Sequence, residues 1–158
     1  MLSSSGAESP LQSAYETLYS LMESAYTRIN PLELFDRVIA GLEDEHEIKV
    51  LCNLMLTKLI VIDPEEMIRR LDSIAERFRA ILSFKPKENA VKQEVEKANE
   101  ASKGVLKVTI LLKNAFPGAA SSSTNPQGQS WKTYVEWVLK DFRVQFHTME
   151  QEVKDQAA

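Results

Sequence analysis

The sequence is poor in the side chains that disulfides, metal sites and phosphate-binding loops require. Its 158 residues include one cysteine, two histidines and five glycines. The single cysteine, Cys52, cannot form an internal disulfide, which fits a reducing compartment inside the cell. The glycines are isolated from one another, so no glycine-rich loop is available to cradle a phosphate. These shortages argue against several large classes of enzyme.

Long apolar runs are also missing. The most apolar stretch, residues 48–62, contains Lys49, Asn53 and Lys58 and is shorter than the ~18 uncharged residues of a membrane span. The first residues lack the basic and then apolar pattern of a secretory signal. A net charge of −4 gives the chain no general attraction for nucleic acid or an anionic membrane. We therefore expect no nucleic acid and no membrane among its partners, although a local basic patch stays open.

The residues that are present indicate one helical domain. Apolar residues make up 44% of the chain and charged residues 27%, which is enough apolar material for a packed core. Apolar positions recur every three or four residues, as in amphipathic helices, and no segment alternates with the period of two of a strand. The sequence predicts an all-α protein with six helices, over residues 12–29, 30–43, 47–62, 64–82, 88–116 and 130–153.

Two similar helix-start signals indicate a repeat. Asn30-Pro31-Leu32-Glu33 has a capping residue, a proline at the first helical position and an acidic third residue. Asp63-Pro64-Glu65-Glu66 has the same features 33 residues later. Helices of this length joined by short turns are typical of helical-hairpin repeats that stack into a solenoid. We therefore expect about six helices in three stacked pairs.

The last predicted helix has the clearest apolar stripe. Trp137 and Val144 lie off this stripe, where they either form a small second contact surface or cover a neighbouring element. The residues of the stripe recur at helical spacing and are expected to be buried: Trp131, Tyr134, Val135, Val138, Leu139, Phe142, Phe146, Met149 and Val153.

Composition divides the chain into four segments. The first is small and polar, and the third is rich in glycine, proline, serine and asparagine. The expected segments are a flexible N-terminal tail (1–11), the helical repeats (12–116), a flexible loop (117–130), and a C-terminal amphipathic helix with its tail (131–158).

The chemistry-bearing side chains do not form a recognisable catalytic or metal-binding pattern. His46 lies in an acidic turn and His147 on the polar side of the last helix, so both are expected to be solvated. Cys52 lies in the most apolar helix, where a buried, inert thiol is expected. The acidic run at residues 43–47 lacks the glycine and the alternating ligands of a calcium-binding loop. We expect no catalytic residue, no metal, no cofactor and no enzymatic activity.

Basic residues gather in the middle of the chain, where glutamates are interleaved with them. Two interpretations are open: a solvated surface of mixed charge, or a ridge that faces a protein partner, since repeat arrays use one continuous face for binding. For the second interpretation the predicted contact residues are Arg69, Arg70, Arg77, Lys85, Lys87, Asn89, Lys92 and Lys97.

Several strings in this region carry a family resemblance. They are Leu32-Glu33-Leu34-Phe35, Gly41-Leu42-Glu43-Asp44, His46-Glu47-Ile48-Lys49, Arg70-Leu71-Asp72 and the run Lys87-Glu88-Asn89-Ala90-Val91-Lys92-Gln93-Glu94-Val95-Glu96-Lys97. Over Ala14 to Phe116 the chain resembles the C-terminal, TATA-binding-protein-interacting and cullin-binding domain of the cullin-associated and neddylation-dissociated proteins. Residues 117–158 match this family less well.

The resemblance implies a fold and a role. It implies HEAT-like repeats at the end of a longer solenoid, which binds a cullin with its RING subunit when the cullin lacks the ubiquitin-like modifier. It also implies competition with the adaptor and substrate receptor, hence regulation of cullin-RING (SCF-type) ubiquitin ligase assembly in nucleus and cytoplasm. No catalytic residue is implied.

The start of the chain raises one further expectation. It begins with a serine-rich stretch where the family continues into earlier repeats, so we expect a fragment or a separate C-terminal gene product that needs an upstream or separate N-terminal portion. The flank of the first helix is then expected to be exposed and to cause weak self-association or reduced stability. The alternative function is a helical-repeat scaffold or transport-type adaptor that binds another protein partner.

Overall fold

The computed structural model describes residues 9–120 and 128–157, and within these residues it contains helices and no strands. The all-α prediction is therefore confirmed. The elements are α1 (Pro10–Ala25), the 3-10 helix η2 (Tyr26–Arg28), α2 (Pro31–Gly41), α3 (His46–Ile62), α4 (Pro64–Ser83), α5 (Lys92–Ala115), the 3-10 helix η3 (Pro117–Ala120), α6 (Gln129–Asp141) and α7 (Arg143–Ala157).

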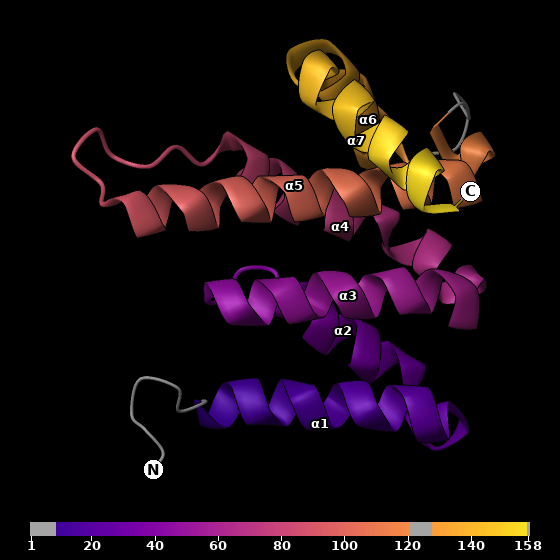
Figure 1. Cartoon of the computed structure of the whole chain (residues 1–158). Coiled ribbons are helices and arrows are strands. Elements are labelled where there is room, and N and C mark those ends of the chain that lie inside the picture. The colour runs from indigo at the N-terminus through magenta and orange to yellow at the C-terminus, as the bar shows by residue number, and fades with distance from the viewer. Residues whose placement is uncertain (1–8, 121–127, 158) are drawn as a thin grey trace.

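The helices form two layers of a short solenoid. Helices α1, α3, α5 and α7 contact one another in sequence along one layer, and α2, α4 and α6 do so along the other. Figure 1 shows α1, α3 and α5 stacked as nearly parallel rods, with α2 and α4 behind them. Successive helices thus pair across the layers, and the predicted stacking of helical pairs is confirmed.

Local capping explains where α1, α2 and α4 begin. Ser9 Oγ accepts a hydrogen bond from Gln12 N at 3.0 Å, and Asn30 Oδ1 accepts one from Leu32 N at 3.0 Å. Asp63 caps α4 by accepting from Glu66 N at 3.2 Å, and its other oxygen accepts from the Tyr26 hydroxyl at 2.6 Å. Burial and this carboxylate raise the pKa of Tyr26. The two start signals predicted from the sequence are therefore used as caps, and the second also ties η2 to α4.

The core runs through the middle of the stack between the two layers. Its largest fully buried side chains include Trp131, Tyr134, Phe35, Phe78 and Phe146. The Tyr134 hydroxyl contacts Thr109 Oγ1 at 2.8 Å, and Thr109 donates to the Val105 carbonyl, also at 2.8 Å. Tyr134 therefore brings its hydroxyl into the core with a partner, which links α6 to α5.

The predicted single C-terminal helix is wrong, because it is broken into α6 and α7 at Phe142. The backbone at Phe142 leaves the helical region, with φ −121° and ψ 31°, although no proline or glycine is present there. The break turns α7 back against α5 and buries Phe146, whereas Leu139 of the predicted stripe is exposed. Packing against α5 thus overrides the continuous helical period of the sequence.

Two other predicted boundaries differ from the structure. The fifth helix begins at Lys92 rather than at residue 88, because residues 84–91 form an extended segment with a turn in which Ala90 N donates to the Lys87 carbonyl at 2.9 Å. The first α-helix ends at Ala25 and is continued by η2.

The two segments predicted to be flexible fall partly outside the described residues. Residues 1–8 of the tail and 121–127 of the loop are not described, whereas α1 begins at Pro10 and the ends of the loop form η3 and the start of α6. The flexibility and the four-segment division stay predictions.

Candidate protein-binding surface

A hollow opens on the side of the stack where α4 leads into α5. Its volume is about 680 Å³, and it lies among the start of α3, the end of α4, the segment 84–91 and the start of α5. In Figure 1 this segment and the first turns of α5 project beyond the end of α3. Fourteen residues line the hollow: His46, Lys49, Ile81, Phe84, Lys85, Pro86, Lys87, Asn89, Ala90, Val91, Glu94, Lys97, Ala98 and Ala101.

A second hollow continues from the first between α3 and α5. Its volume is about 380 Å³, and it shares Lys49 and Ala101 with the first hollow. It reaches Met149 on α7 and is also lined by Val50, Asn53, Leu54, Thr57, Glu100, Lys103, Gly104, Lys107 and Val108. We call the two hollows together the α3–α5 groove.

The groove combines exposed apolar side chains with lysines. Phe84 and Val91 are 63% and 61% exposed, and Val50 and Leu54 on α3 are 42% and 45% exposed. The lysines among the lining residues are Lys49, Lys85, Lys87, Lys97, Lys103 and Lys107, and the glutamates are Glu94 and Glu100. A mostly cationic, partly apolar groove thus lies on a chain whose net charge is −4.

Half of the predicted contact residues lie together in this groove. Lys85, Lys87, Asn89 and Lys97 line its wider hollow. The Lys97 ammonium lies 3.8 Å from a carboxylate oxygen of Glu47 on α3. Lys92 lies one turn before Glu96, to which its ammonium is 3.8 Å distant, and its side chain is almost fully exposed. The polar start of α5 is therefore exposed, as predicted.

The three predicted arginines lie apart from the groove, along α4. Arg69 is exposed and donates to Glu66 at 2.9 Å. Arg70 is only 19% exposed, because it bonds to Glu66 at 2.7 Å, to Asp36 of α2 and to the Leu32 carbonyl at 3.3 Å. The hydrogen bond from Arg70, assisted by Arg69, lowers the pKa of the buried Glu66. Arg70 thus joins α4 to α2.

Arg77 also makes contacts within the chain. Its Nε lies 3.4 Å from a carboxylate oxygen of Glu43, which follows α2, and its Nη1 lies 3.5 Å from Glu76. The side chain is about one quarter exposed. The predicted contact set therefore divides into four groove residues with Lys92 beside them, and three arginines on the α2–α4 side. That any of them touches a partner stays a prediction.

The structure corrects the prediction for one histidine. His46 was expected to be solvated, but its side chain is 17% exposed and its Nε2 lies 3.5 Å from Glu100, because α5 packs over the start of α3. His147 is mostly exposed, as expected, and lies 3.7 Å from Glu150.

Cys52 is fully buried, also as expected, and this burial raises the pKa of its thiol to about 12. The thiol is therefore protonated at neutral pH and unreactive.

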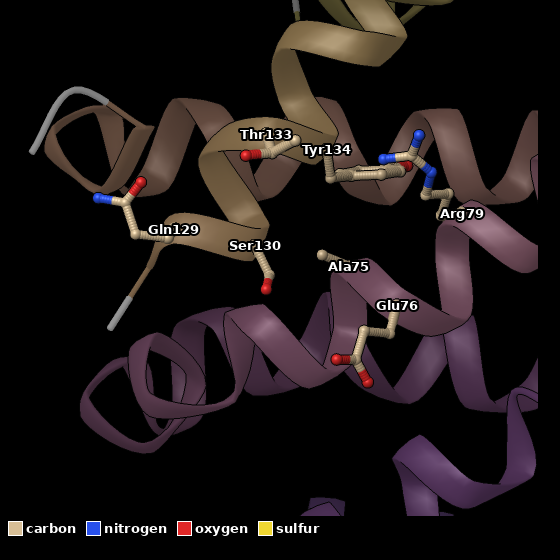
Figure 2. A pocket seen from close by; sticks show the side chains of 7 residues that line it. All are labelled: Ala75, Glu76, Arg79, Gln129, Ser130, Thr133 and Tyr134. Carbon is tan, nitrogen blue, oxygen red and sulfur yellow. The ribbon is translucent and has the colours of Figure 1, made fainter. Parts of the chain in front are cut away.

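A third hollow, of about 270 Å³, lies between α4 and α6. Figure 2 shows Ala75 and Arg79 on α4 opposite Ser130, Thr133 and Tyr134 on α6, with Gln129 at one end and the Glu76 side chain extending away from α6. The Arg79 guanidinium lies over the Trp137 ring, 4.7 Å from its centroid. Trp137 is half-buried against the core. It therefore covers a neighbouring element, which is one of the two roles predicted for it.

The described residues, 9–120 and 128–157, also lack the features of two other kinds of site. They contain no group of three His, Cys, Asp or Glu side chains arranged to hold a metal ion. None of the helices in this part of the chain combines the length and hydrophobicity that crossing a bilayer requires.

The sequence-based prediction missed several residues of the groove: Phe84, Lys49, Lys103 and Lys107. Phe84 is the extended residue that directly follows α4, and the three lysines lie on α3 and α5, which are apart in sequence. An apolar residue directly before the Lys85-Pro86 break was a usable signal for Phe84. The lysines carried no comparable signal, because only the pairing of α3 with α5 brings them together.

The paired layers and the open groove define this chain as an all-α helical-repeat solenoid. A family model described as "TATA-binding protein interacting (TIP20)" matches residues 11–139. The C-terminal part of Cullin-associated NEDD8-dissociated protein 1 from Emericella nidulans is 48% identical over 141 residues. Cullin-associated NEDD8-dissociated protein 2 from Mus musculus is 35% identical over 126 residues. The chain therefore belongs to the family of C-terminal domains of the cullin-associated NEDD8-dissociated proteins.

The matches cover most of this chain and a small part of its relatives. The aligned residues are 89% of this chain and 13% of the Emericella protein, and 80% of this chain and 9% of the mouse protein. The family match extends through most of α6, beyond Phe116, where the resemblance found in the sequence became weaker.

Proposed function

We propose that this chain is a non-catalytic, cullin-binding part of a HEAT-repeat assembly factor. In this role it binds a cullin that lacks the ubiquitin-like modifier, together with its RING subunit. It competes with the adaptor and substrate receptor, and so promotes their exchange on cullin-RING ubiquitin ligases in nucleus and cytoplasm. An N-terminal solenoid portion, upstream or on a separate chain, supplies the other arm of the interaction.

The family match over residues 11–139 is the observation that carries this proposal, since the relatives are named for association with cullins. The structure adds physical support. Stacked helical pairs form a rigid surface, and such a surface can exclude a second ligand from a shared partner. Mutual exclusion is the requirement of an exchange factor, because each bound protein must lower the affinity of the other by the same factor.

The second candidate function is a scaffold or transport-type adaptor that binds another protein. The two-layer helical stack favours it to the same degree, since such stacks support many binding partners. The two candidates differ in one measurable property, which is displacement from a cullin by the adaptor.

Co-elution from a size-exclusion column tests the proposal. The purified chain is mixed with an unmodified cullin-RING complex, with and without the N-terminal solenoid portion and with and without the adaptor. We expect a complex that forms in the absence of the adaptor and dissociates when the adaptor is added. The same cullin carrying its ubiquitin-like modifier serves as the negative control.

Two outcomes would contradict the proposal. If the chain does not co-elute with the cullin even when the N-terminal portion is present, the scaffold alternative becomes the better explanation. If it co-elutes equally well with and without the adaptor, cullin binding stands and the competitive exchange role is wrong.

A further inference from the structure

We propose that the α3–α5 groove binds an extended acidic segment of a partner protein that carries an aromatic or aliphatic side chain. This inference rests on the proposed function, because it specifies the chemistry of the segment that the domain receives from its protein partner. Three properties of the groove lead to it: its exposed apolar side chains, its charge and its shape.

Four exposed apolar side chains gather in this groove, while other exposed apolar side chains, such as Val61 and Val144, lie elsewhere on the surface. Phe84 and Val91 face the wider hollow, and Val50 and Leu54 line the narrower one. The sequence predicts that α3 is covered on several sides, because its apolar residues surround most of the helix. The groove is one of two places where this cover is incomplete among the described residues, the other being the end of α3 at Val61 and Ile62. Single exposed apolar residues are ordinary, whereas a continuous group marks a binding surface.

The charges around these side chains are complementary to an acidic partner. Six lysines and two glutamates line the groove, as given above. No carboxylate among residues 9–120 and 128–157 lies within ion-pair distance of Lys49, Lys85, Lys87, Lys103 or Lys107, whereas Lys97 lies near Glu47. Five ammonium groups thus remain available to a ligand, while the rest of the chain is net negative. Such a field attracts an acidic segment and disfavours a basic one.

The same side chains favour a peptide over a nucleic acid. Sequence-independent binding of single-stranded DNA or RNA uses several aromatic rings on which the bases stack. The groove offers one exposed ring, that of Phe84, beside the mostly buried imidazole of His46, and otherwise the branched aliphatic side chains of Val91, Val50 and Leu54. These side chains match an aliphatic or aromatic residue of a peptide.

The shape of the groove favours an extended segment. Its two hollows, about 680 and 380 Å³, meet at Lys49 and Ala101 and follow α3 and α5 toward Met149 on α7. Gly104 has no side chain and so leaves room at the α5 wall of the narrower hollow. The occupant is therefore expected to bind along the helices with its apolar side chain near Phe84 and its carboxylates near the lysines.

Panning of a displayed library of random twelve-residue peptides tests this inference. The full chain is compared with two variants, Lys85→Glu/Lys87→Glu and Phe84→Ser, and with the control Lys140→Glu/Lys154→Glu. The control has the same change in charge at exposed positions on α6 and α7. All four positions that change charge are exposed, so circular dichroism melts are expected to agree within ~2 °C.

We expect the chain and the control to enrich acidic peptides that contain an aromatic or aliphatic residue. The best of them is expected to bind at least about tenfold more weakly to each groove variant, and more weakly at higher salt. Enrichment of neutral or basic peptides, or equal binding to the groove variants, would overturn the inference. A single-stranded RNA 20-mer that displaces the peptide and binds more tightly would assign the groove to nucleic acid and overturn it too.

The co-elution assay separates failure of this inference from failure of the proposed function. If the cullin complex binds the chain and both groove variants equally, the groove inference fails and cullin binding stands elsewhere on the surface. If acidic peptides bind the groove but the cullin complex does not bind the chain, the proposed function fails and the groove remains a peptide-binding site.

Discussion

At the scale of single residues, similar charged side chains have very different roles. Arg70 and Glu66 are largely buried and bonded to each other, so they join α2 and α4. Lys85 and Lys87, which come from the same basic region of the sequence, are exposed in the groove. Replacing the first pair is therefore expected to affect folding, whereas replacing the second is expected to affect binding.

The Glu66 carboxylate provides a pH-dependent test of this distinction. Because its pKa is lowered in the folded state, the unfolded chain takes up its proton first as the pH falls. The stabilisation is therefore complete above the ordinary carboxyl pKa of ~4.3 and is lost as the pH falls below it. Glu66→Gln is expected to lower the free energy of unfolding by about 2 kcal/mol at pH 7, with a smaller difference at pH 3.

Urea unfolding of both proteins between pH 7 and pH 3 measures this effect. Glu65→Gln, on the exposed side of the same helical turn, is the matched control and is expected to change stability by less than ~0.5 kcal/mol. A Glu66→Gln variant with the same loss at both pH values would show that packing, and not ionisation, explains the role of this residue.

At the scale of elements, the helices differ in how they begin. Ser9, Asn30 and Asp63 cap α1, α2 and α4 from the adjacent sequence. The start of α6 is capped from another helix, since the Asp72 carboxylate on α4 accepts hydrogen bonds from Gly128 N at 2.9 Å and from Trp131 N at 3.0 Å. Gly128 adopts φ +96°, which a residue with a side chain rarely tolerates. The position of α6 thus depends on α4.

Replacing Asp72 is expected to loosen α6 from the stack. Asp72→Ala removes both acceptors from partly buried N–H groups, so we expect a loss of about 1–3 kcal/mol in the free energy of unfolding. Amide hydrogen exchange is expected to speed up first in residues 128–135. Asp141→Ala, at the exposed end of α6, serves as the control. Exchange that increases equally in α1 and α6 would contradict a local capping role.

At the scale of the whole molecule, the solenoid leaves one end helix partly uncovered. Leu11 and Leu21 of α1 are exposed, and a hollow of about 320 Å³ lies beside them, where Leu18, Ile29 and Leu34 also contribute. In Figure 1, α1 forms the outer edge of the stack. Among the described residues no further helix covers this face. A preceding repeat of a longer solenoid would pack there.

This edge is expected to cause weak, reversible self-association. Leu21→Glu places a charge on the exposed apolar face and is expected to reduce the dimer fraction in sedimentation velocity at high protein concentration. Ser24→Glu, also exposed on α1, is the control for added charge. Addition of the N-terminal solenoid portion is expected to suppress self-association. A monomer at all concentrations would show that this face needs no partner.

The predictability of the molecule differs between its parts for physical reasons. The helices that start at Pro31 and Pro64 were predicted well, because their caps lie beside them in the sequence. The break at Phe142 was not predicted from the sequence, because it depends on the packing of Phe146 against the core. Four groove residues were named from the basic run after α4, whereas Lys103 and Lys107 became part of the groove only through the pairing of α3 with α5.

The sequence by itself determined that the chain is all-α, that it is built from repeated helical pairs and that Cys52 is buried. These properties follow from local interactions, since capping and helical periodicity act over a few residues. The tertiary structure alone decided the bend between α6 and α7, the capping of α6 by Asp72 and the continuity of the α3–α5 groove. Each of these depends on side chains that are far apart in the chain, and only the packing of the two layers brings them into contact.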